Sequence, residues 1–193
     1  MDPAVWQQPW YLIRRKVLKL FGGAFHIYLP DGRLGFYCKM AAFKLKEDIR
    51  LYSDEGMQEE LLTIKARQIL DFGATYDVVD APTGQLIGSL RRRAFKSILR
   101  DEWDILAPGD QPVGQVIEDS TMMALLRRFL SNLIPQGFTF SLQGRVVAEL
   151  RQNFNPFVLK ITADFSGDPQ FTLDRRIGIA AGILMAAIEG RQG

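Results

Sequence analysis

An uninterrupted apolar run near the end of the sequence is the feature that most constrains how this chain can fold. Every residue from Ile177 to Ile188 is apolar or glycine, and small residues recur within the run at Gly178, Ala181, Gly182 and Ala186. A helix with no polar side has to be surrounded by protein. At ~1.5 Å per residue the run is roughly 18 Å long, too short to cross the ~30 Å hydrocarbon core of a bilayer. We therefore expect a thin, enclosed helix over about residues 175–189.

The residues at the start of this helix indicate how its end is stabilised. Asp174 is a good N-cap, and Gly190 follows the last residue of the expected helix. Arg175 and Arg176 occupy the first turn, where the helix dipole disfavours positive charge. We therefore expect both arginines to have anionic partners.

Most of the remaining chain shows the pattern of short antiparallel strands. Turn signals rich in Pro, Gly and Asp recur near residues 30–32, 82–84, 108–110 and 143–144. Between them, side chains alternate with a period of two, as over 138–143 and 157–162, which places one side of each strand inward. Hairpins at this spacing indicate a sandwich or a barrel. A mainly β shell around the apolar C-terminal helix is the simplest arrangement.

One further segment has a helical rather than a strand period. Apolar residues with helical spacing fill one side of residues 122–134, and Pro135 and Gly137 follow them. The pattern predicts an amphipathic helix over about residues 121–134, packed on the outside of the sheet.

The chain lacks the residues that common catalytic and metal sites require. It has one histidine, His26, and one cysteine, Cys38, whereas a zinc site needs about four such ligands. Neither a nucleophile elbow nor a phosphate-binding loop motif occurs. Adjacent carboxylates such as Asp101–Glu102 and Glu118–Asp119 point apart on a strand, and we expect them to be solvated. A net charge of +2 gives no sign of a nucleic-acid partner. We therefore expect no enzyme activity, no cofactor and no metal.

Several short stretches, taken in order, carry a family resemblance over nearly the whole chain. They are YLIRRK at 11–16, FHIY at 25–28, YDV at 76–78 with Gly84 and Gly88, and LDRR at 173–176 leading into the apolar helix. In this order they resemble the LURP-one-related branch of the Tubby C-terminal-like superfamily, to which phospholipid scramblases are also similar. The resemblance implies a closed antiparallel barrel of about twelve strands that encloses the C-terminal helix.

The same resemblance implies a role at membranes. Tubby-like domains bind phosphoinositide head groups, and scramblases act at membranes and respond to calcium. Asp164, Asp168 and Asp174 lie where scramblases carry an acidic segment. Pro169 interrupts the pattern, and the alternating oxygen ligands and closing Glu of an EF-hand-type loop are missing. We therefore expect a polar turn with a helix cap here rather than a calcium site.

Basic clusters beside aromatic residues are the remaining feature with chemical content. Cations near aromatic side chains suit an anionic lipid surface, where each charge contributes roughly 1 kcal/mol. The candidate head-group ligands are Arg14, Arg15, Lys16, Arg91, Arg93 and Lys96. The alternative is a solvated barrel face whose cations are balanced by nearby carboxylates. On the first interpretation, replacing Arg91, Arg93 and Lys96 by Gln weakens lipid binding and hardly changes stability.

The predicted function is a non-catalytic binding module that recognises anionic phospholipid head groups. The alternative is a protein-interaction scaffold that docks a protein partner on the 122–134 helix. We expect residues 1–193 to form one Tubby C-terminal-like domain, with residues 1–9 loose. Residues 1–10 are polar and interrupted by proline, unlike a signal peptide. A cytoplasmic protein, peripheral to a membrane when bound, is therefore expected.

Overall fold

The fold is a closed antiparallel barrel of twelve strands, in the order β1-β12-β11-β10-β9-β8-β7-β6-β5-β4-β3-β2. The computed structural model describes residues 2–16, 23–40, 49–67, 73–93, 101–119, 136–153 and 158–189. Its strands are β1 Trp10–Lys16, β2 Gly23–Tyr28, β3 Leu34–Met40, β4 Ile49–Tyr52, β5 Glu60–Ala66, β6 Thr75–Asp80, β7 Gln85–Arg92, β8 Glu102–Ala107, β9 Gln111–Glu118, β10 Gly137–Leu142, β11 Arg145–Asn153 and β12 Val158–Asp164. The mainly β barrel predicted from the sequence is confirmed.

Pairing of the first strand with the last closes the barrel. Leu12 lies opposite Thr162 and Arg14 lies opposite Lys160, while β2 pairs with the other side of β1. Closure satisfies the backbone groups that an open sheet would leave at its edges. The tight turn between β10 and β11 has Gln143 and Gly144 at φ values of 50° and 79°. Two successive positive φ values are typical of the hairpin turns that match the twist of the strands.

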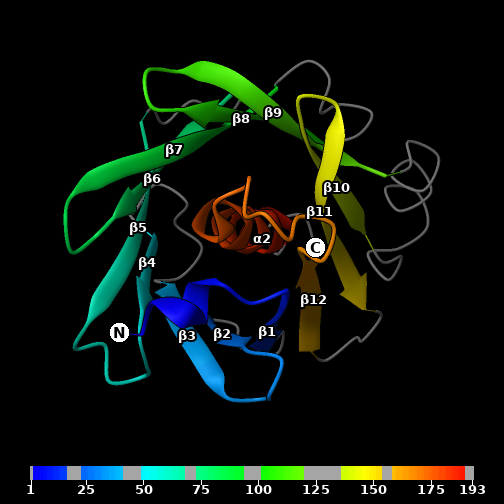
Figure 1. Ribbon diagram of the computed structural model, residues 1–193. Coiled ribbons are helices and arrows are strands. Elements are labelled where there is room, and N and C mark those ends of the chain that lie inside the picture. Colours follow the sequence, from blue (N-terminus) through cyan, green and yellow to red (C-terminus); the bar gives the residue numbers. More distant parts are fainter. Residues whose placement is uncertain are drawn as a thin grey trace.

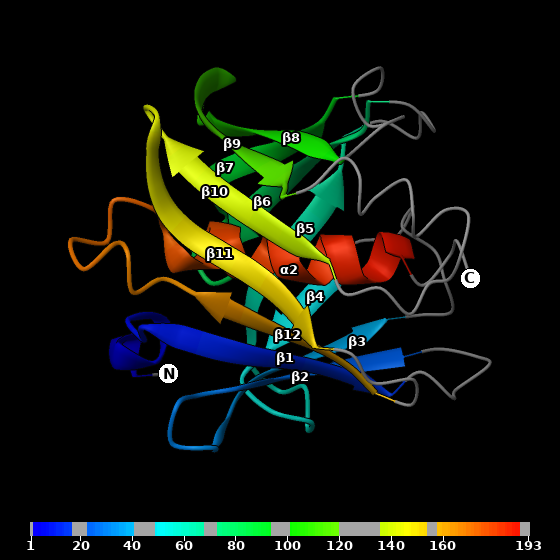
Figure 2. The same ribbon diagram turned by 90° about the vertical axis from the view of Figure 1, so that its right-hand side faces the viewer.

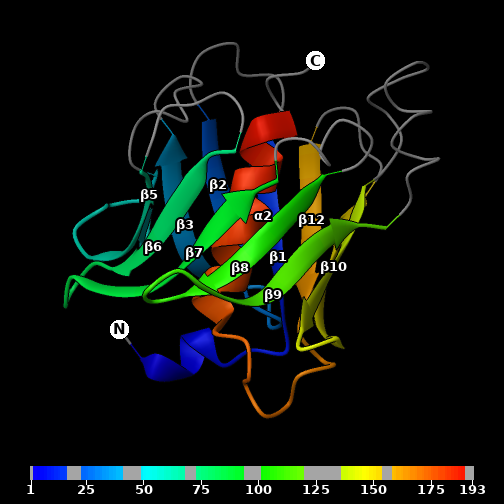
Figure 3. The ribbon, with the colours of Figure 1, turned by 90° about the horizontal axis from the view of Figure 1, so that it is seen from above.

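The C-terminal helix α2, Arg175–Glu189, lies within the ring of strands in the view along the barrel (Figure 1). Two further directions show strands on both sides of it (Figures 2 and 3). Each hydrophobic residue of α2 from Ile177 to Ala187 is at most 4% exposed. A Cβ atom added at Gly182 would lie 2.6 Å from Ile13 Cδ1 and 3.7 Å from Leu150 Cδ2, side chains of β1 and β11. The small residues of α2 thus permit close packing against the inner face of the barrel.

A buried ion pair anchors the start of α2. Arg175 Nη1 donates to Asp168 Oδ2 at 2.8 Å, and both side chains are 3% exposed. The Arg175 guanidinium lies between the rings of Phe165 and Phe171, 4.7 and 4.6 Å from their centroids. Burial opposes ionisation of Asp168, but hydrogen bonds from Thr172, from the Leu173 N–H and from Arg175 outweigh it and hold its pKa at about 2.

The second arginine of the first turn is also paired. Arg176 bonds to Asp174 at 2.7 Å and to Asp80, at the end of β6, at 2.9 Å. The prediction of anionic partners for Arg175 and Arg176 is therefore confirmed. Asp174 also accepts a hydrogen bond from the Arg176 N–H, as expected of a helix cap. Within the described ranges, no group of three or more metal-ligating side chains could hold an ion.

The N-terminal segment is more ordered than the sequence indicates. Residues 1–9 were expected to be loose, but a short 3₁₀ helix, η1 Pro3–Trp6, follows the Asp2 cap. The Trp6 ring stacks on Phe36 at a centroid distance of 4.1 Å, and the Tyr11 hydroxyl donates to the Val5 carbonyl at 2.9 Å. The Trp6–Phe36 contact joins residues distant in the sequence, so local composition gave no sign of it.

The amphipathic helix expected over about residues 121–134 lies outside the described residues. Its role as a docking face for a protein partner stays a prediction. No helix in the part of the chain that the structure describes has the length and hydrophobicity needed to span a membrane.

Candidate anion-binding surface

The six cations predicted to bind head groups fall into different environments. Arg91, in β7, and Arg93, directly after it, both bind Asp104 in the neighbouring strand β8. Arg91 Nη2 lies 2.9 Å from Asp104 Oδ2, and Arg93 Nε lies 2.7 Å from Asp104 Oδ1. Burial opposes ionisation of Asp104, but the bonds from Arg93 and Arg91 outweigh it and lower its pKa. These two cations are therefore already engaged by a carboxylate.

This arrangement corrects the expectation that the carboxylates on the outer face of the barrel are solvated. Trp103 and Ile105 of β8 belong to the core, so Asp104 between them faces outward, yet its side chain is only 7% exposed. Glu102 and Glu118, which were expected to be solvated, are 6% and 4% exposed. The carboxylates are covered because the side chains of neighbouring strands lie over them; Arg93 Nη1, for example, is 3.6 Å from Glu102 Oε2.

A further ion-pair cluster on adjacent strands was not anticipated from the sequence. Arg67, after β5, contacts Asp77 and Asp110 at 2.7 Å each, and Ser89 at 3.0 Å. Asp110 lies in the turn between β8 and β9, far from Arg67 along the chain. The outer face over β6–β9 is therefore covered by ion pairs.

Arg15 lies on the inward side of the barrel and is partly exposed. On β1 it shares the inward side with Tyr11 and Ile13, which are 0% and 1% exposed. Its Nη1 lies 3.5 Å from the Ala186 carbonyl near the end of α2, and its guanidinium lies 5.6 Å from the Phe25 ring centroid. Burial lowers the pKa of Arg15. A cation close to the negative end of a helix dipole stabilises that helix.

Two of the six cations have side chains outside the described residues. The backbone of Lys16 ends β1, but its side chain lies outside the described residues. Lys96 lies in the undescribed connection between β7 and β8. Their roles in head-group binding stay predictions.

Arg14 is the remaining member of the set, and it lies on the outer face of the barrel. It lies directly opposite Lys160 of β12 on one side and His26 of β2 on the other. Its guanidinium lies 5.5 Å from the ring centroid of Tyr28. Among the described residues, neither Arg14 nor Lys160 has an ion-pair partner. Sequence reasoning missed Lys160 because only barrel closure brings β12 beside β1. We call these two residues the Arg14–Lys160 pair.

The environment beside this pair contains one titratable imidazole. His26 Nε2 lies 2.7 Å from Glu55 Oε1, in the turn between β4 and β5. The imidazole packs edge-on to Tyr37 at a centroid distance of 5.2 Å and lies 6.3 Å from Tyr28. Burial and the nearby Glu55 carboxylate raise the pKa of Tyr37. The outer face of β1 to β3 therefore combines cations with aromatic rings.

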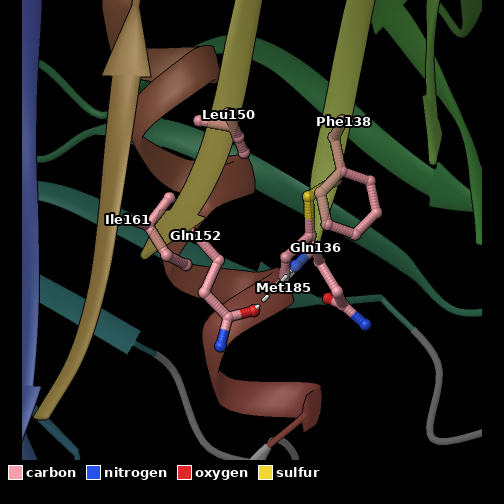
Figure 4. A pocket seen from close by; sticks show the side chains of 6 residues that line it. All are labelled: Gln136, Phe138, Leu150, Gln152, Ile161 and Met185. Carbon is pink, nitrogen blue, oxygen red and sulfur yellow. Dashed lines mark hydrogen bonds between the residues drawn. The ribbon is translucent and has the colours of Figure 1, made fainter. Parts of the chain in front are cut away.

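A small cavity lies between α2 and strands β10–β12 (Figure 4). Figure 4 shows its lining side chains, Gln136, Phe138, Leu150, Gln152, Ile161 and Met185. Its volume is about 10 Å³, which is room for about one water molecule. The Gln136 N–H donates to Gln152 Oε1 across it at 3.3 Å. This cavity could not hold a small-molecule ligand.

The comparison with known families agrees with this architecture. The family model described as LURP-one-related matches residues 34–187, which cover β3 through nearly all of α2. No curated protein matches the chain significantly. The match covers well over half of the sequence, and the chain belongs to the LURP-one-related family.

Proposed function

We propose that this protein is a non-catalytic binding module that recognises anionic phospholipid head groups at a membrane surface, with the Arg14–Lys160 pair as its contact. Membership of the LURP-one-related family supports a binding role in general. The specific ligand is inferred from the surface chemistry of the barrel.

The observation that carries the proposal is a pair of like charges directly opposite each other. Arg14 and Lys160 are in register on neighbouring strands, and neither forms an ion pair in the described part of the chain. Like charges in this position destabilise a sheet by roughly 0.2–1 kcal/mol. An anion placed between or above them removes that repulsion. The pair is therefore better suited to a bound state with a negatively charged surface than to water alone.

Aromatic side chains near the pair fit the same surface. Trp10 is on the outward side of β1, four residues before Arg14 on the same side of the strand, and the Tyr28 ring lies beneath the Arg14 guanidinium. Both side chains are partly exposed. Trp and Tyr favour the interface between lipid head groups and hydrocarbon because their rings are apolar at one end and polar at the other.

Other parts of the described barrel provide poorer sites for an anionic head group. Among the described residues, Leu184, Ile183 and their neighbours on α2 occupy the space inside the ring of strands, and the cavity near Met185 holds about one water. Arg91 and Arg93 are already neutralised by the buried Asp104 carboxylate. The outer face of β12 and β1 therefore supports head-group binding best.

Vesicle flotation tests the proposal. Arg14→Gln/Lys160→Gln removes two charges at ~1 kcal/mol each, so we expect binding to phosphatidylglycerol–phosphatidylcholine vesicles to weaken by roughly 30-fold. A matched control, Lys65→Gln/Arg145→Gln, removes one lysine and one arginine that are exposed on other strands. The control should retain most of the binding, and wild-type binding should fall steeply with added salt. Wild-type protein that fails to float, or equal losses in both double variants, would refute the assignment.

A further inference from the structure

We propose that protonation of His26 strengthens membrane binding, so that this module binds anionic bilayers more tightly in mildly acidic solution. The inference rests on the proposed function of the Arg14–Lys160 pair. It adds a regulatory input, pH, to that surface.

The position of His26 carries the proposal. The backbone register places Lys160, Arg14 and His26 side by side across β12, β1 and β2, on the outer face of the barrel. A positive charge on the imidazole would extend a row of two cations to three. Histidine changes charge between pH 5 and 8, and His26 is the only histidine of the chain.

The groups around the imidazole allow it to take up a proton without rearrangement. When the ring is neutral, its Nε2–H can donate to Glu55 Oε1 at 2.7 Å, and Nδ1 can then accept the proton. The charged groups that face the imidazole are Glu55, in the turn between β4 and β5, and Arg14 on β1. From β3 the Tyr37 ring packs against His26, and Tyr28 lies farther along β2. The local charge of Lys160, Arg14 and Glu55 is +1, and protonation of His26 raises it to +2.

Flotation at two pH values measures the effect. Vesicles of phosphatidylglycerol and phosphatidylcholine are suitable because both phosphodiesters keep their charge between pH 5.5 and 7.5. One additional charge near an anionic leaflet contributes ~1 kcal/mol, so the wild-type affinity at pH 5.5 should exceed that at pH 7.5 by about fivefold. In His26→Gln this ratio should fall to about one. In His26→Arg, which carries a permanent charge, the ratio should also be about one, with affinity at pH 7.5 close to that of wild type at pH 5.5.

The outcomes separate the inference from the function on which it rests. If wild type binds through the Arg14–Lys160 pair but equally well at both pH values, the role of His26 is refuted and the proposed function stands. If His26→Gln keeps the wild-type ratio, other titrating groups are responsible and the inference is also refuted. If wild type floats at neither pH, both are refuted. Thermal melting of His26→Gln and His26→Arg establishes that each variant is folded, and either variant alone suffices for the comparison.

Discussion

Replacing the two glycines on the inner helix by alanine distinguishes an enclosed helix from an exposed one. In an open helix, Gly→Ala stabilises by ~1 kcal/mol. Here an added Cβ at Gly178 would lie 2.4 and 2.5 Å from ring atoms of Phe165, and one at Gly182 would lie 2.6 Å from Ile13 Cδ1. Ordinary contacts between carbon atoms are about 3.5–4.0 Å. Both substitutions therefore require a neighbour to move.

The two neighbours differ in their freedom to move. Phe165 is 1% exposed, and its ring packs edge-on to Tyr11 at 5.9 Å and faces Arg175 at 4.7 Å. It has no room to shift, so Gly178→Ala should incur an overpacking cost near the upper end of ~1–3 kcal/mol. Cδ1 of Ile13 is the end of a flexible side chain, so the cost at Gly182 should be near the lower end.

After subtracting the ~1 kcal/mol gain in helix propensity, we expect Gly178→Ala to destabilise by ~2 kcal/mol and Gly182→Ala to be close to neutral. For a chain of this size, ~2 kcal/mol lowers the melting temperature by roughly 4–8 °C. Urea denaturation followed by tryptophan fluorescence measures both differences. An increase in stability of ~1 kcal/mol for both variants would show that α2 is not enclosed. Gly182→Leu adds a second test: an enclosed helix loses stability, whereas a membrane anchor would keep its melting temperature and bind vesicles more strongly.

Three other expectations follow from the buried polar groups. Arg91→Gln/Arg93→Gln leaves the Asp104 carboxylate without its partners, so the free energy of unfolding should fall in urea denaturation. The loss should be smaller than the ~3–5 kcal/mol of a fully buried pair because the two arginines are 43% and 35% exposed, and no loss would contradict the assigned contacts. Asp168→Asn breaks a pair that is buried on both sides and should lower the free energy of unfolding by ~3–5 kcal/mol. The folded pKa of Asp168 is about 2, below the unfolded value of ~3.9, so wild-type stability should be constant above about pH 5 and decline as the pH falls from about 4 to 2. Part of this decline should be absent in the variant. Burial raises the pKa of the Cys38 thiol to about 12, so a thiol reagent should label it only after unfolding, and rapid labelling of folded protein would contradict its burial.

The architecture was predictable because its signals are local. Alternation with a period of two identifies strands, and the all-apolar run from Ile177 identifies a helix that has to be surrounded. The charges at Arg175 and Arg176 conflicted with the helix dipole, and this conflict correctly indicated anionic partners. Each of these inferences depends on residues that are near one another along the chain.

The surface was less predictable because its contacts depend on strand register. Arg91 and Arg93 resemble solvated cations until β8 is paired beside β7 and places Asp104 under them. Lys160 becomes the neighbour of Arg14 only when the last strand pairs with the first. A one-residue change of register would turn every one of these side chains to the opposite face. Composition and spacing therefore identified the basic residues but could not assign their partners.

The register also separates the cations that maintain the fold from those available for binding. Arg91 and Arg93 neutralise a buried carboxylate, whereas Arg14 and Lys160 face each other with like charge. Removing the second pair should therefore relieve repulsion, and Arg14→Gln/Lys160→Gln should leave the free energy of unfolding unchanged or raise it by up to ~1 kcal/mol. Urea denaturation at low salt, where the repulsion between the two charges is least screened, is the appropriate measurement. A loss of more than ~1 kcal/mol would mean that these side chains stabilise the folded barrel, and the loss of vesicle binding in this variant could then no longer be assigned to charge.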